Sequence, residues 1–149
     1  MDMEQAGKEM AGANPRESFR HALEILAEEA YEDVAYKYGN EFSKNPKEIY
    51  WQDACLQFSE SLKDILQRKN IKSKFRYLDI KSLKPRAPKH VILETADYLI
   101  DGTWQQFEDG SPHPDHRCLI LRKNALEEDL EKARVPRRLW FLYLGASPK

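Results

Sequence analysis

Three residues whose side chains could together carry out nucleophilic chemistry occur along the chain in the order Cys55, His90 and Asp101. Cys55 falls in the first turn of a helix expected over residues 53–69, where the helix dipole and free backbone amides favour a thiolate. His90 opens a predicted strand, and Asp101 closes the strand that follows it. Two antiparallel neighbours can bring imidazole and carboxylate side by side while the helix end delivers the thiol. This pattern indicates a nucleophile, a base that activates it and a group that orients the base.

A second group of chemically capable residues lies in the segment HPDHRC, and it contains His113, Asp115, His116 and Cys118. Two histidines and a cysteine so close together could bind zinc. No second cysteine pair or distant histidine pair completes a set of four ligands. We therefore interpret the segment as a polar loop on the rim of the site, and we expect no metal.

The elements that must position these residues begin with two helices. Asn14 and Pro15 are typical of a helix start, and Gly39 of a helix end. Between them runs an apolar stripe at spacings of three and four, formed by Phe19, Leu23, Leu26, Ala30, Val34 and Tyr38. The second helix, residues 53–69, is also apolar on one face, and Asn70 is its expected stop.

Strand-forming segments follow the helices. The predicted strands are residues 71–80, 90–95, 98–101 and 139–144, with a loop at 107–116 and a short helix at 124–133. Helices first and strands after predict an α+β fold in which N-terminal helices pack on a small antiparallel sheet. A chain of 149 residues fits one domain. We place that domain at residues 14–149, after a disordered tail at 1–13.

The order of the three residues and their local strings resemble the papain-like and transglutaminase-like superfamily of cysteine hydrolases. CLQFSESL, which starts at Cys55, is similar to the nucleophile helix of that superfamily, and HVILE, which starts at His90, to its histidine strand. The string IDGTW around Asp101 is similar to its Asp-Pro-Thr pattern, with Gly102 in place of the proline. The resemblance covers residues 50–108.

The most specific string is DGTWQQF, which is close to strings of bacterial papain-like glutamine deamidases of the toxin and effector type. In that group a glutamine shortly after the aspartate helps to form the oxyanion hole, and Gln106 holds the matching position. Papain-type proteases place the glutamine before the cysteine, and Gln52 could be read that way. The resemblance thus implies two donors for the oxyanion, the Cys55 backbone amide and either Gln106 or Gln52.

The resemblance implies a cysteine-dependent amide hydrolase that acts on a protein or peptide through a thioester and needs no cofactor. Deamidation of a protein glutamine is the first expectation for the reaction. Proteolysis and transfer to an amine share the same acyl-enzyme, so both stay open. The alternative from another class is a non-catalytic interaction module that keeps the fold.

The composition indicates the cellular compartment in which such a protein acts. Two cysteines are few for an oxidised secreted scaffold, so we expect free thiols in a reducing compartment. The polar N-terminal segment has no signal-peptide core, and no apolar run of about 18 residues predicts a membrane span. We expect a cytoplasmic protein or, by the resemblance to effectors, one delivered to a host cytosol without a signal peptide.

Charge is unevenly distributed although the net charge is only −1. Residues 61–90 hold 10 basic side chains against Asp64 and Asp79. A stretch like this, residues 63–89, could face an acidic partner or nucleic acid. We interpret it mainly as solvated surface, keep the acidic partner open and do not expect nucleic acid.

Overall fold

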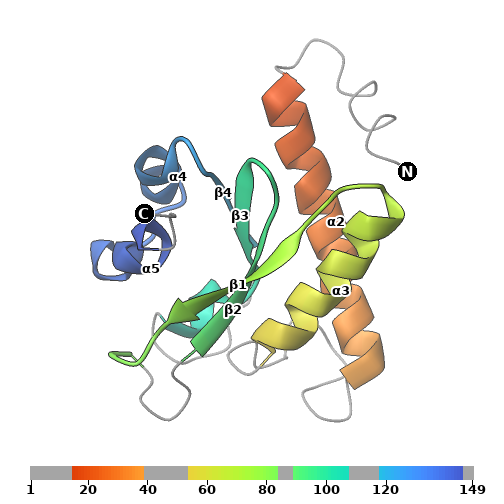
Figure 1. The fold of residues 1–149 in the computed structure, drawn as a ribbon, viewed down its shortest axis with the longest axis horizontal. Helices are drawn as coiled ribbons and strands as arrows, with labels where there is room; N and C mark the ends of the chain where they lie inside the picture. The colour runs from red at the N-terminus through yellow and green to blue at the C-terminus, as the bar shows by residue number, and fades with distance from the viewer. Residues whose placement is uncertain (1–14, 39–53, 84–88, 108–117, 146–149) are drawn as a thin grey trace.

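A computed structural model of the chain describes residues 15–38, 54–83, 89–107 and 118–145 (Figure 1). The α-helices in these residues are α2 (Pro15–Tyr38), α3 (Cys55–Arg68), α4 (Leu126–Lys132) and α5 (Trp140–Leu144). The strands are β1 (Lys74–Asp79), β2 (Lys89–Glu94), β3 (Tyr98–Asp101) and β4 (Leu119–Arg122), and the 3-10 helices are η3 (Trp104–Phe107) and η4 (Arg137–Leu139). The predicted α+β class is confirmed, whereas the tail predicted at residues 1–13 lies outside the described residues.

The sheet is antiparallel, with the strands in the order β1-β2-β3-β4. β1 and β2 pair over all six residues of each strand. β2 and β3 pair at two positions next to their turn, Leu93↔Ile100 and Glu94↔Leu99. The predicted hairpin of residues 90–95 and 98–101 is therefore confirmed, but its strands do not pair at the end where His90 lies.

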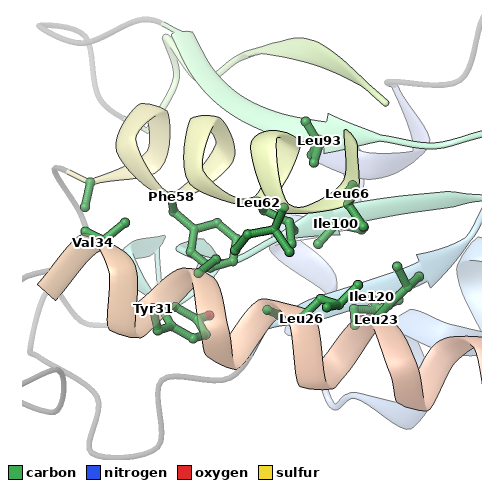
Figure 2. Packing of buried hydrophobic residues seen from close by; sticks show 14 of the residues in the cluster. Leu23, Leu26, Tyr31, Val34, Phe58, Leu62, Leu66, Leu93, Ile100 and Ile120 are labelled. Atoms are coloured by element: carbon green, nitrogen blue, oxygen red, sulfur yellow. The ribbon is translucent and has the colours of Figure 1, made fainter. Parts of the chain in front are cut away.

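One face of the sheet is covered by α2 and α3 (Figures 1 and 2). Both helices are amphipathic and direct their apolar faces to the sheet, as the spacing predicted. The buried residues labelled in Figure 2 are Leu23, Leu26, Tyr31 and Val34 of α2, Phe58, Leu62 and Leu66 of α3, and Leu93, Ile100 and Ile120 of the sheet. α3 ends near Asn70, as predicted, since the Ile71 N–H donates back to the Leu66 carbonyl and Asn70 has a φ of 61°.

The opposite face is covered by η3 and the C-terminal segment (Figure 1). Side chains alternate along a strand, so His90 shares the face of Ile92, and Asp101 shares the face of Leu99. Ile92 and Leu99 belong to this second core, together with Trp104 and Leu139. The imidazole and carboxylate therefore point into the layer formed by the C-terminal half of the chain.

The strand predicted over residues 139–144 is wrong, because this segment ends η4 and forms α5. Burial within it follows a helical and not an alternating pattern: Leu139, Trp140, Leu142 and Tyr143 are buried, and Phe141 and Leu144 are exposed. A run of six apolar and aromatic residues has no period of its own, so packing decides between helix and strand. The fourth strand is β4, which sequence analysis left unassigned and which pairs with all of β3.

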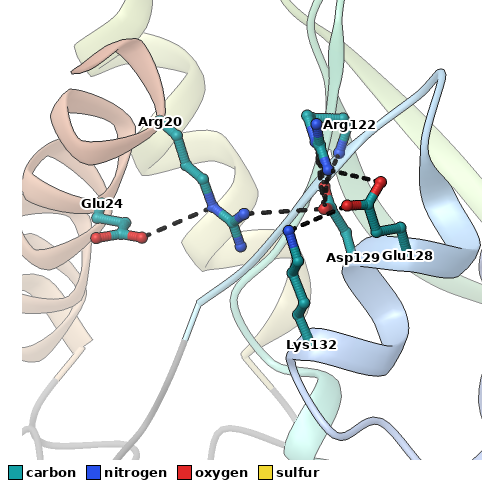
Figure 3. Close-up of polar contacts among 6 residues, drawn as sticks. All are labelled: Arg20, Glu24, Arg122, Glu128, Asp129 and Lys132. Carbon is teal, nitrogen blue, oxygen red and sulfur yellow. Dashed lines mark hydrogen bonds and ion pairs between the residues drawn. The ribbon is translucent and has the colours of Figure 1, made fainter. Parts of the chain in front are cut away.

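A network of charged groups joins α2, β4 and α4 (Figure 3). The buried Asp129 carboxylate accepts hydrogen bonds from the Arg122 backbone N–H at 2.8 Å and from its Nη2 at 2.7 Å. Arg20 of α2 approaches the same carboxylate at 3.9 Å. Burial by itself raises the pKa of Asp129, but these bonds outweigh it and hold the pKa below its usual value. The network fixes the C-terminal layer to the sheet and to the first helix.

Among residues 15–38, 54–83, 89–107 and 118–145, no helix is long and apolar enough to cross a membrane.

Candidate active site

Cys55 is the first residue of α3, and its half-buried thiol faces β2. The sulfur is hydrogen-bonded to the His90 side chain and accepts the backbone N–H of Val91. Burial by itself raises the pKa of this thiol, but the two hydrogen bonds and the positive charge of His90 outweigh it and lower the pKa. The positive end of α3 acts in the same direction. The two hydrogen bonds, the charge of His90 and the helix end thus favour the thiolate of Cys55 against the effect of burial.

The separation of β2 from β3 explains how the sulfur reaches this place. The Val91 N–H interacts with the Cys55 sulfur, and the Val91 carbonyl accepts the Ser59 hydroxyl at 3.4 Å. Both backbone groups of Val91 therefore bond to α3, at a position where β2 has no pairing with β3. The first turns of α3 take the place of a strand partner beside His90, which fixes the distance between the helix and the base.

His90 and Asp101 form a buried pair on the second face of the sheet. His90 Nε2 lies 2.8 Å from Asp101 Oδ2, and the two residues are only 1% and 2% exposed. Since Nε2 faces the carboxylate, Nδ1 is the nitrogen available to the thiol. Burial by itself lowers the pKa of His90, but the Asp101 charge, its hydrogen bond and the bond to Cys55 together raise it to about 9. Near neutral pH the imidazole is therefore protonated, and it lies next to a thiol whose pKa is lowered.

Two further groups hold the Asp101 carboxylate. The Thr103 backbone N–H donates to Oδ1 at 3.0 Å, an Asx turn that the order Asp-Gly-Thr favours. The Tyr143 hydroxyl of α5 donates to Oδ2 at 2.8 Å, although Tyr143 lies 42 residues further along the chain. Sequence analysis did not identify either group. An Asp followed by glycine was a usable signal for the first, whereas nothing local to Tyr143 indicated the second.

Gly102 follows Asp101 and is enclosed by two aromatic residues of the helical layer. The Tyr31 hydroxyl donates to the Gly102 carbonyl at 2.7 Å. A Cβ on Gly102 would overlap the ring of Phe58. Glycine at this position therefore lets the end of β3 approach α3 closely enough to bring Asp101 toward the start of that helix.

Gly102→Ala should lower the free energy of unfolding by about 1–3 kcal/mol, because the added methyl group must displace the Phe58 ring or the backbone beside Asp101. Denaturant unfolding of the purified variant measures this loss. In a Phe58→Leu background the same substitution should cost clearly less, since the overlapping ring is gone. An equal cost in both backgrounds would place the cause elsewhere.

The 3-10 helix η3 covers the buried pair formed by His90 and Asp101. Phe107 packs edge-on against the His90 ring, with centroids 5.0 Å apart, and its carbonyl accepts the Arg138 side chain at 2.8 Å. Trp104 of η3 is buried in the same core as Phe107. These apolar neighbours keep water from the His90–Asp101 bond and so strengthen it.

The side chains of both predicted oxyanion donors lie outside the described residues. The backbone of Gln106 is part of η3, but its side chain is outside the described residues, and so is the whole of Gln52. The predicted zinc alternative also falls largely outside, because His113, Asp115 and His116 are not described. Within the described ranges, no group of three His, Cys, Asp or Glu side chains could hold a metal ion.

Cys118, the other cysteine, differs from Cys55 in its surroundings. It is a free, partly buried thiol at the start of β4. Burial is the main cause that raises its pKa well above the ordinary value, and the charge of Asp101 adds to this. Cys118 therefore stays protonated and is a natural internal control for the reactivity of Cys55.

Part of the basic stretch at residues 63–89 has internal partners. Arg76 lies 3.1 Å from the buried Glu94 carboxylate, and Lys74 and Lys123 pair with the same group. Lys63 lies over the Phe75 ring, 6.0 Å from its centroid. An acidic partner for the rest of the stretch stays a prediction.

Comparison of the chain with models of protein families, with curated proteins and with solved structures finds no match. A functional proposal therefore rests on the chemistry of the site and on the sequence strings around it.

Proposed function

We propose that this protein is a cysteine-dependent amide hydrolase with a papain-like or transglutaminase-like core and that Cys55, His90 and Asp101 are its catalytic residues. The observation that carries the proposal is the continuous chain of hydrogen bonds from the Cys55 sulfur through His90 to Asp101. The pKa of the thiol is lowered and that of the imidazole is raised, and both shifts favour the nucleophile and base that covalent catalysis needs.

In the proposed reaction, the Cys55 thiolate attacks the carbonyl carbon of a carboxamide, and the carbonyl oxygen becomes an oxyanion. The Cys55 backbone amide and the side chain of Gln106, or failing it Gln52, would hold that oxyanion. Protonated His90 then gives its proton to the leaving nitrogen, and ammonia departs as the thioester forms. Neutral His90 next takes a proton from water, which attacks the thioester and releases a carboxylate and the thiol.

Deamidation of a protein glutamine is the reaction we propose, and the likeness of DGTWQQF to glutamine deamidases supports it. The contacts of Cys55, His90 and Asp101 fit any reaction with a thioester intermediate, so proteolysis and transfer to an amine are the alternative outcomes of the test. The test incubates the protein with an unfolded glutamine-rich protein, with and without a primary amine.

Mass spectrometry of the glutamine-rich protein distinguishes the outcomes. Conversion of glutamine to glutamate, with release of ammonia, is expected for the wild type and not for Cys55→Ala. Backbone cleavage would assign a protease, and incorporation of the amine a transferase. If none of these reactions occurs and Cys55 is no more reactive than Cys118, the proposal of an enzyme is wrong and the non-catalytic module takes its place.

A further inference from the structure

The Tyr143 hydroxyl and the His90 ring donate to the same oxygen of Asp101. His90 Nε2 and the Tyr143 hydroxyl each lie 2.8 Å from Oδ2. All three residues are buried, so water does not replace either donor. Burial, followed by the nearby charge and hydrogen bond of Asp101, raises the pKa of Tyr143 well above its ordinary value. The hydroxyl therefore stays a donor over the whole pH range in which the protein would work.

We propose that Tyr143 is a positioning residue that controls how tightly His90 holds its proton, by sharing Asp101 Oδ2 with the imidazole. This inference rests on the proposed function and deepens it. A carboxylate oxygen that accepts two hydrogen bonds spreads its negative charge over two donors, and each bond is weaker than it would be alone. Tyr143 thus draws part of the Asp101 charge away from His90.

The proposed reaction requires that His90 can both give up and take a proton, and the shared bond affects this. His90 must be protonated when ammonia leaves but must give up its proton before water attacks the thioester. Its pKa is already raised to about 9 by Asp101 and Cys55 against the opposing effect of burial. A stronger bond to Asp101 would hold the proton further into the alkaline range and slow hydrolysis of the thioester near neutral pH.

Three other titratable groups lie around the pair of His90 and Asp101, and their charges bear on the His90 pKa. Cys55 of α3 faces His90 directly and is the partner in the proposed reaction. Tyr31 of α2 and Cys118 at the start of β4 lie near Asp101, and burial is the largest cause that raises the pKa of each. Both groups stay neutral near pH 7, so neither adds a charge beside Asp101. Tyr143 differs from them because its hydroxyl is bonded to Oδ2, the oxygen that also binds His90.

Tyr143→Phe tests the inference because phenylalanine keeps the ring and removes the shared donor. Two-dimensional NMR of the imidazole nitrogens, with His90 assigned by a His90→Gln variant, follows the titration of His90 without any substrate. We expect the His90 pKa to rise by about 0.5–1 unit, the shift that corresponds to part of one charge-assisted hydrogen bond. An unchanged or lowered pKa would overturn the inference.

Tyr31→Phe is the matched control. Tyr31 is also a fully buried tyrosine, and its hydroxyl donates to the Gly102 carbonyl next to Asp101. Its loss should lower stability by an amount similar to that for Tyr143→Phe but leave the His90 pKa in place. If both variants shift the His90 pKa equally, the effect is structural and the inference fails.

A second substitution keeps the test decisive even where Tyr143→Phe does not fold. Tyr143→3-fluorotyrosine has almost the same size and a more acidic hydroxyl, so it donates more strongly to Asp101 and should lower the His90 pKa. A shift in the same direction as with phenylalanine, or no shift, would contradict the inference. Neither measurement requires turnover, so failure of the inference is distinguishable from failure of the proposed function, which the reactivity of Cys55 in the unaltered protein reports.

Discussion

Replacement of Cys55 by alanine should abolish amide hydrolysis, with a loss of turnover of about 10⁴-fold or more, because the proposed thioester forms on its sulfur. The fold should persist, since the thiol is only half-buried and α3 is held to the sheet by Phe58, Leu62 and Leu66. Initial rates on a glutamine-containing protein, together with circular dichroism, measure the two effects separately.

Cys118→Ala is the control for this result. Its thiol is kept protonated by burial, so the substitution should leave the rate within a small factor of the wild type. If Cys55→Ala retains full activity, covalent catalysis at Cys55 is excluded. If instead Cys118→Ala removes activity, the nucleophile has been assigned to the wrong cysteine.

Asp101→Asn should lower the rate on the order of 10³–10⁴-fold while the chain still folds. Both carboxylate oxygens accept hydrogen bonds, Oδ1 from the Thr103 N–H and Oδ2 from His90 and Tyr143. An asparagine has only one acceptor oxygen, so its amide group must face one of these donors. The negative charge that raises the His90 pKa is lost as well, and with it part of the stabilisation of the thiolate.

Two measurements check this prediction. The rate of hydrolysis reports the loss of catalysis, and the titration of His90 by NMR should show a pKa clearly below the value of about 9 that applies with Asp101 in place. Asp64→Asn, which removes an exposed carboxylate from α3, should change neither quantity. A full rate in Asp101→Asn with an unaltered His90 titration would show that Asp101 does not act on the imidazole.

The three residues of the candidate site could be found from the sequence because local patterns carry them. Cys55 stands at the start of an amphipathic helix, and His90 and Asp101 flank a short hairpin whose turn and strand-forming residues are plain in the sequence. Strand alternation places His90 and Asp101 on the same face of the sheet. Local patterns also gave the α+β class and the helical layer.

The parts that the sequence could not supply depend on packing between distant segments. β4 is only four residues long, which is too short to show an alternation of apolar and polar residues. The sequence of α5 is uniformly apolar, so its packing against the sheet decides that it is a helix. Tyr143 lies in the segment that was predicted as a strand, so its hydrogen bond to Asp101 could not be predicted. The roles of Gln106 and Gln52 stay predictions.

The central claim is that Cys55 is held as a thiolate by protonated His90, and the pH dependence of its alkylation tests this most directly. Iodoacetamide reacts with thiolates, and mass spectrometry of the labelled peptides separates Cys55 from Cys118 in the same sample. A lowered pKa means that the thiolate persists as the pH falls below the ordinary thiol value of about 8.5. Labelling of Cys55 should therefore stay fast at neutral pH and slow only at lower pH, whereas Cys118 reacts slowly throughout, and His90→Ala should return Cys55 to ordinary thiol behaviour. Equal, slow labelling of both cysteines, unaffected by His90→Ala, would contradict the account.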